Sequence, residues 1–164
     1  MSRRKRTVPV VAAAAVIVAV VVVAGLVAAN QGGDGPSSRA EVTDKLGQRW
    51  VVNLAARPAE PGAGTPVEVT IGIANPTGNA QTISFPSNRQ IELQAKDGDG
   101  KVVWRSDEPD VKVDLSRSIG KKPAEFTRTW STTGLKTGRY TVEGAVLAQE
   151  LEGRGRVGTA VVLR

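Results

Sequence analysis

The sequence predicts an all-β domain, an antiparallel β-sandwich of about eight short strands, preceded by one N-terminal transmembrane helix. Apolar and polar residues alternate after Arg49, with the period of half-buried strands. Clusters of Gly, Pro, Asn and Asp separate these stretches, and beyond Asn30 no helical period lasts for more than a turn or two. The helix is predicted by 20 consecutive apolar residues near the N-terminus.

The apolar run extends from Val10 to Ala29. At about 1.5 Å per residue it can cross a hydrocarbon core of about 30 Å. The basic stretch "SRRKR" before it predicts a cytoplasmic tail over residues 1–6, a signal-anchor helix over residues 7–29 and an extracytoplasmic remainder. We therefore expect a cell-membrane protein that crosses the bilayer once, through residues 7–29.

A cleaved signal peptide is the alternative, since "VAA" before Asn30 has small residues at the two positions that a signal peptidase reads. Cleavage after Ala29 would give a secreted domain. The run is longer than the about 7 to 15 apolar residues usual in a signal peptide, and the chain has no cysteine to accept a lipid anchor. Both alternatives export the domain.

The basic tail also explains most of the net charge of +6. It holds four of the 22 basic residues, and the rest of the chain has 18 basic and 16 acidic residues. The excess positive charge therefore marks the cytoplasmic side of the predicted membrane helix and not a nucleic-acid-binding surface, so we expect no nucleic-acid partner. Residues 30–48 begin with Gly, Ser, Pro and Asp, which predicts a flexible linker, with a short strand or helical turn near Ala40 to Leu46 as the alternative. Residues 49–164 form the predicted sandwich. Without cysteine, that sandwich depends on its hydrophobic core alone.

The clearest strand is "PVEVTIGIAN", in which Val67, Val69, Ile71 and Ile73 share one face. The other alternating stretches are "RWVVNLAA", "AQTISF", "IELQAK", "KVVWRS", "EFTRTW", "RYTVEGAVL" and "VGTAVVL". All six aromatic residues fall in these predicted strands, and we expect them to fill the core. In "LKTGRY", the order of Leu, Gly and Tyr140 is that of a tyrosine corner in immunoglobulin-like sandwiches, which predicts a buried, hydrogen-bonded phenol.

The stretch "KDGDGKVVWRS" could be a calcium loop, a phosphate cradle or a turn. It lies between two predicted strands, and Asp and Gly are the residues of tight hairpin turns because glycine adopts positive φ. We therefore predict a hairpin that needs no ligand. Its register is expected to place Val102 and Trp104 in the core.

The absence of histidine and cysteine excludes a Ser-His-Asp triad and, in practice, a structural zinc site. Ser106, Ser116 and Ser118 lie near Lys121 and Lys122, so a serine-lysine dyad is an alternative, but Ser and Lys in one exposed loop are ordinarily just solvated residues. No Gly-rich phosphate loop opens a helix. We expect no enzymatic activity, no catalytic residue and no cofactor.

A group of carboxylates follows Trp104 along the chain, namely Asp107, Glu108, Asp110 and Asp114. An exported domain could use such oxygens for calcium, which takes about 6 to 8 of them. Their spacing does not match that of a calcium loop, and a charged connection needs no ligand. The sequence therefore predicts no metal site.

The longest connection between predicted strands is "DEPDVKVDLSRSIGKKPA", residues 107–124, which is acidic in its first half and basic in its second. An edge strand from Val111 to Leu115 is one interpretation. Long loops on rigid sandwiches often carry binding sites. The candidate partner-binding residues are Asp107, Asp110, Arg117, Lys121 and Lys122. A solvated connection without a partner is the alternative.

The stretches "NPTGNAQTISFPSNRQIELQAKDGDGKVVWRS", "FTRTW" and "LKTGRYTVEGAV" together resemble the BsuPI-type intracellular proteinase inhibitor domain. The likeness lies in the order of the features: an Asn-rich turn, a Phe-ended strand, an alternating strand, an Asp-Gly turn, a Val-Trp strand, a Trp-ended strand and a Gly-x-Tyr strand. It covers roughly residues 67–147. The resemblance implies a sandwich that binds or inhibits a serine protease.

The chain departs from that family in one segment and in its expected location. The charged "VWRSDEPDVKVDL" stands where family members often have a second aromatic and a Phe-containing loop. Founding members act inside the cell, whereas this domain is predicted outside. Two functions are therefore expected: a membrane-anchored binding domain for a protease or another envelope protein, or a non-inhibitory structural or assembly module of the cell envelope.

Overall fold

The computed structural model describes residues 35–164, which form ten strands and one short 3-10 helix. In chain order these are β1 (Ser37–Thr43), β2 (Arg49–Arg57), β3 (Val67–Ala74), β4 (Gln81–Phe85), β5 (Ile91–Lys96), β6 (Val102–Arg105), β7 (Leu115–Ile119), β8 (Ala124–Trp130), β9 (Gly138–Val146), η1 (Gln149–Leu151) and β10 (Arg156–Leu163). Every pairing between them is antiparallel. The predicted all-β antiparallel class is confirmed.

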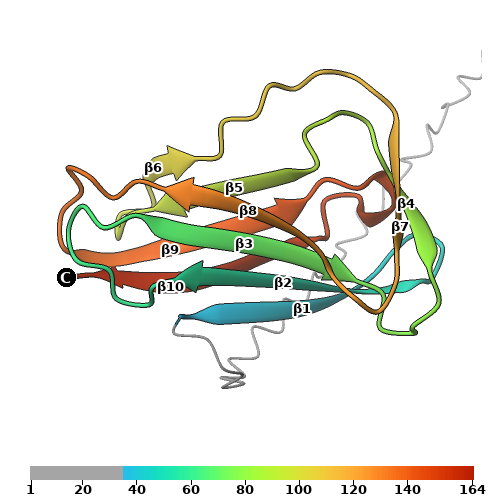
Figure 1. Ribbon diagram of the computed structural model, residues 1–164, viewed down its shortest axis with the longest axis horizontal. Helices are drawn as coiled ribbons and strands as arrows, with labels where there is room; N and C mark the ends of the chain where they lie inside the picture. The colour runs from blue at the N-terminus through green and yellow to red at the C-terminus, as the bar shows by residue number, and fades with distance from the viewer. Residues whose placement is uncertain (1–34) are drawn as a thin grey trace, which may run out of the picture.

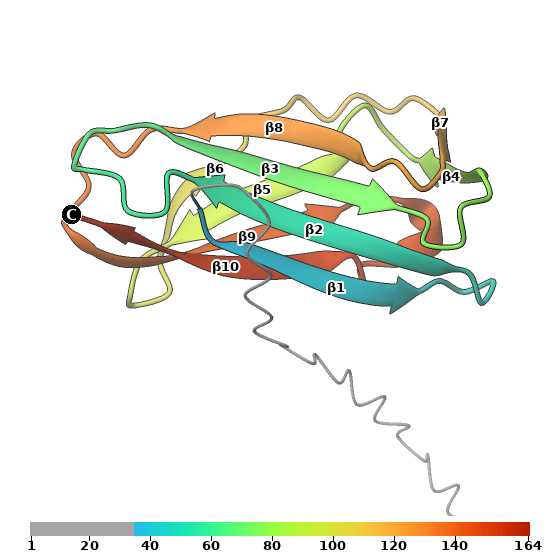
Figure 2. The same cartoon turned by 60° about the horizontal axis from the view of Figure 1, so that its bottom comes forward.

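Two four-stranded sheets lie face to face, one in the order β1-β2-β3-β8 and the other in the order β10-β9-β5-β6 (Figure 1). β4 and β7 pair with each other in a separate two-stranded sheet. This small sheet lies at one end of the molecule, while the C-terminus lies at the other (Figures 1 and 2). The sandwich thus has two distinct ends.

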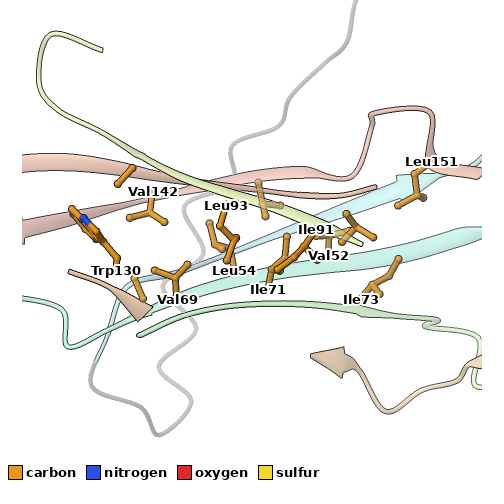
Figure 3. Close-up of a cluster of buried hydrophobic side chains, with 14 of the residues drawn as sticks. Val52, Leu54, Val69, Ile71, Ile73, Ile91, Leu93, Trp130, Val142 and Leu151 are labelled. Atoms are coloured by element: carbon orange, nitrogen blue, oxygen red, sulfur yellow. The ribbon is translucent and has the colours of Figure 1, made fainter. Parts of the chain in front are cut away.

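Apolar side chains from both sheets meet in one core (Figure 3). The predicted face of β3 is fully buried, because Val67, Val69, Ile71 and Ile73 all have 0% exposure. Gly144 of β9 lies opposite this face. A Cβ on Gly144 would come within 2.9 Å of both Ile71 Cδ1 and Leu93 Cδ2, so glycine is what allows close packing here.

The aromatic residues occupy strands as predicted, and they divide into three groups by burial. Trp50, Phe85 and Trp130 are fully buried, Tyr140 is 6% exposed, and Trp104 and Phe126 are half-buried against the core. The Tyr140 hydroxyl donates to the carbonyl of Lys136 at 2.7 Å. This bond confirms the predicted tyrosine corner.

The predicted hairpin at the Asp-Gly repeat is confirmed. It joins β5 to β6, with the Asp97 amide donating to the Lys101 carbonyl at 2.9 Å and Gly100 at φ 81°. The placement of Val102 in the core was wrong. A β-bulge at Val103 shifts the register, so Val103 and Trp104 pack against the core, whereas Val102 is half-buried outside it.

The prediction of a flexible linker over residues 30–48 was wrong for Ser37–Thr43, which form β1. This strand pairs with β2 over seven positions, from Ser37 opposite Ala55 to Thr43 opposite Arg49. Its inward face carries only Val42 and half-buried small residues, a weak apolar signal that the polar residues between them conceal. The folded domain therefore begins before residue 49.

The predictions of a basic tail over residues 1–6, a transmembrane helix over residues 7–29 and cleavage after Ala29 lie outside the described residues, as do residues 30–34 of the predicted linker. Within residues 35–164 no helix is long and apolar enough to span a bilayer.

Candidate partner-binding surface

The β4–β7 sheet is held against the sandwich by its inner face and by one of its edges. Ile83, Phe85 and Ile119 are buried on the inner face. At the edge of β4, the Ser84 amide donates to the Glu150 carboxylate of η1 at 3.0 and 3.1 Å. Because these contacts fix both strands, the small sheet is part of the rigid domain.

Residues 106–114 connect β6 to β7 and cross the molecule toward the β4–β7 end (Figure 1). Ser106 fixes the start of this segment, since its amide donates to the Leu93 carbonyl at 2.9 Å and its Oγ accepts from the Leu93 amide at 3.1 Å. Further along, Glu108 forms an ion pair with Arg128 of β8. The connection is therefore braced at its beginning.

A second brace holds the middle of the segment, at Val111. The Val111 amide donates to Asn88 Oδ1 at 2.8 Å, and the Asn88 amide donates to the Val111 carbonyl at 3.1 Å. The Val111 side chain is nevertheless 53% exposed, and that of Val113 is 40% exposed. The backbone is thus held in place while two apolar side chains face solvent.

The edge strand predicted from Val111 to Leu115 was wrong, because β7 occupies Leu115–Ile119 instead. The alternation of Val111, Val113 and Leu115 satisfies the pattern of a strand, but β4 pairs only with the residues that follow. Ile119 is buried and Leu115 half-buried, which fixes the register of β7.

The five predicted site residues are all exposed, but they lie at different points along the segment. Asp107 lies at its start, Asp110 in its middle, Arg117 within β7, and Lys121 and Lys122 in the connection from β7 to β8. The Arg117 guanidinium lies 5.4 Å above the Phe126 ring centroid and Arg117 Nε donates to Gln90 Oε1. The five predicted residues therefore form an extended surface rather than a compact cluster.

A shallow hollow of about 410 Å³ lies where four parts of the chain meet. It is lined by Pro86, Ser87 and Arg89 of the β4–β5 connection, by Asp110 and Lys112, by residues 146–148 at the end of β9, and by Gly153. Among the predicted residues only Asp110 contributes to it. Sequence inspection missed Arg89 and Lys112, whose only signal was their charge.

The structure gives Ser106, one of the serines considered for a serine-lysine dyad, a structural role, since it is buried and bonded to Leu93. Across residues 35–164 no three acidic side chains gather in a way that could hold a metal ion. Glu108 in particular is committed to Arg128. Ser106 and Glu108 therefore both hold the segment to the sandwich.

Three carboxyl groups of the described chain have a lowered pKa, and all three lie outside this segment. Arg49 lowers the pKa of Glu41 through a hydrogen bond and its charge. Burial raises the pKa of Glu143, but the Lys96 and Gln94 hydrogen bonds outweigh it and lower the value overall. Glu41 and Glu143 bond to neighbouring strands on the sheet surfaces, whereas the third group, Asp44, is buried and bonds to Trp50 and the β1–β2 turn.

No protein-family model and no curated protein matches this chain. Among solved structures, a β-glucosidase from Listeria innocua aligns with 71% of this chain and 16% of its own length, at 11% identity and a TM-score of 0.41. A CARDB domain from Pyrococcus furiosus aligns with 81% of this chain and 97% of its own, at 15% identity and a TM-score of 0.37. The chain thus matches only a small part of the glucosidase.

Proposed function

We propose that this chain is a membrane-anchored, extracytoplasmic binding domain that docks a partner protein through residues 107–122. The observation that carries the proposal is the exposure of Val111 and Val113 on a segment whose backbone is braced by Asn88. A preorganised segment loses little conformational entropy on binding, and exposed apolar side chains among charged ones supply area for an interface.

The polarity of the domain supports the proposal. β1 begins with Ser37 opposite Ala55, near the end of β2, and β10 finishes with Leu163 opposite Gly138. Both positions belong to the end of the sandwich away from β4 and β7 (Figure 1). A chain anchored by residues 7–29 would enter the domain at that end, so the β4–β7 end, toward which residues 107–122 run, would face away from the membrane.

The resemblance to BsuPI-type domains extends the proposal to one class of partner, an exported serine protease that the domain binds or inhibits. The tyrosine corner at Tyr140 supports the immunoglobulin-like assignment on which that resemblance depends. The alternative is a non-inhibitory structural or assembly module of the envelope. That alternative requires the anchor and the sandwich but not the exposed side chains of the segment.

The test is a crosslinking pull-down of the full chain from its native membrane, comparing the wild type with the double variant Val111→Ser, Val113→Ser. Val162→Ser is the matched control, because Val162 is also 40% exposed but lies in β10, near the other end. We expect the double variant to lose the captured partner and the control to keep it. Equal capture by all three proteins would favour the structural module.

A further inference from the structure

The two edges of the β4–β7 sheet differ. On the β4 edge, the Ser84 amide points away from β7, since it donates to the Glu150 carboxylate. Ser84 is opposite Ser116 in the register, so this pair is a non-hydrogen-bonded one. In an antiparallel pair the two kinds of position alternate, which fixes the direction of every backbone group of β7.

It follows that Ser116 and Ser118 direct their amides and carbonyls away from β4, while Leu115, Arg117 and Ile119 bond to it. The next position with the same parity is Gly120, and its carbonyl indeed accepts from Asn75, which lies outside the small sheet. In the described part of the chain β7 pairs with no strand other than β4. Since residues 116–118 are exposed, their outward backbone groups form an open sheet edge.

The charges beside this edge select the kind of strand that could pair with it. Arg117 lies in β7, and Lys121 and Lys122 follow it. A second copy of β7 added about a two-fold axis at Arg117 would place two arginines directly opposite each other, which is unfavourable. An acidic strand has the complementary charge. In an antiparallel strand, its acidic residues would lie in the N-terminal half, beside Lys121 and Lys122.

We infer that the partner pairs with β7 by strand addition, contributing an extended acidic segment that bonds to the outward backbone groups of Ser116 and Ser118. This inference rests on the proposed binding function and specifies its mode. Main-chain hydrogen bonds hold the segment, and the basic residues determine its charge.

The probe is an amidated Glu-Glu-Val-Thr-Val-Thr-Val peptide, added to the full chain in detergent, with a lysine-for-glutamate peptide as the charge control. Bound glutamate peptide should slow amide hydrogen exchange at Ser116 and Ser118. Ser118→Pro removes one outward amide and should weaken binding about tenfold. Thr82→Pro is the matched control, because Thr82 is opposite Ser118 and its amide faces the other edge of the same sheet.

The inference is overturned if the folded wild type does not bind the glutamate peptide, if the lysine peptide binds equally, or if exchange slows elsewhere but not at Ser116 and Ser118. The exchange measurement uses the wild type, so it tests strand addition even if Ser118→Pro does not fold. A partner captured through Val111 and Val113 but unaffected by a folded Ser118→Pro would overturn strand addition and leave the proposed function standing. Loss of capture by Val162→Ser alone would contradict the proposed function itself.

Discussion

The indole of Trp50 donates to the carboxylate of Asp44 at 2.9 Å in the interior of the domain. Asp44 is 4% exposed and also accepts from the amides of Leu46 and Gln48, at 2.8 and 2.9 Å. One carboxylate therefore closes the β1–β2 hairpin and satisfies the polar atom of a fully buried tryptophan. This contact ties the turn after β1 to the core.

Replacing Asp44 should destabilise the domain strongly. Asp44→Ala leaves the buried Trp50 N–H without its acceptor and removes both bonds to the turn, and we expect a loss of about 2 to 3 kcal/mol in the free energy of unfolding. Urea denaturation followed by circular dichroism measures it. Asp97→Ala is the control, because Asp97 accepts similar backbone bonds in the exposed β5–β6 turn. This variant should lose less of the free energy of unfolding than Asp44→Ala. Equal losses in the two variants would contradict the role given to Trp50.

Stability should fall in acid. Burial raises the pKa of Asp44, but hydrogen bonds from Trp50, Gln48 and Leu46 outweigh it and hold the pKa below the ordinary 3.8. Because the folded pKa is the lower one, this stabilisation is complete above the unfolded pKa and is lost as the pH falls through the folded pKa. Thermal unfolding from pH 7 to pH 2 should show a decline below about pH 4, which is smaller in Asp44→Asn. An equal decline in Asp44→Asn would mean that titratable groups other than Asp44 cause the loss of stability in acid.

Removing the phenol of the tyrosine corner should also weaken the fold. Tyr140→Phe keeps the packing but leaves the Lys136 carbonyl without its donor, so we expect a loss of about 1 kcal/mol. Thr127→Val is the control, since it removes an exposed hydroxyl bond to Thr70 and should change stability little. Denaturant titration measures both. An unchanged midpoint for Tyr140→Phe would refute the tyrosine corner.

The close approach of the two sheets can be tested at Gly144. Gly144→Ala places a methyl group 2.9 Å from Ile71 Cδ1, and overpacking of this kind should cost about 1 to 3 kcal/mol. Adding Ile71→Val removes that methyl and should restore part of the stability. Gly98→Ala, where a Cβ meets nothing within 4 Å, is the neutral control. Additive losses in the double variant would contradict the packing described.

The parts of the fold that were predicted correctly follow from local rules. The alternation in β3 buries one face, the Asp-Gly repeat favours a tight turn, and the order of Leu135, Gly138 and Tyr140 makes the corner. Each depends on residues that are close together in the chain. Neighbouring side chains were therefore enough to determine them.

The parts that were missed depend on distant residues. β1 has little apolar content and is defined by pairing with β2, and the choice of Leu115–Ile119 over the Val111 stretch is made by β4. The hollow beside Asp110 needs four segments that only the tertiary fold brings together. Periodicity alone cannot choose between two alternating stretches when the partner strand decides the register.

Site-specific photocrosslinking of the full chain in its native membrane shows whether residues 107–122 contact a partner. A photoreactive amino acid is placed at Val113 in one variant and at Val162 in another, because both side chains are 40% exposed. We expect a discrete crosslinked protein from position 113 and none from position 162. The same product from both positions, or none from position 113, would contradict it.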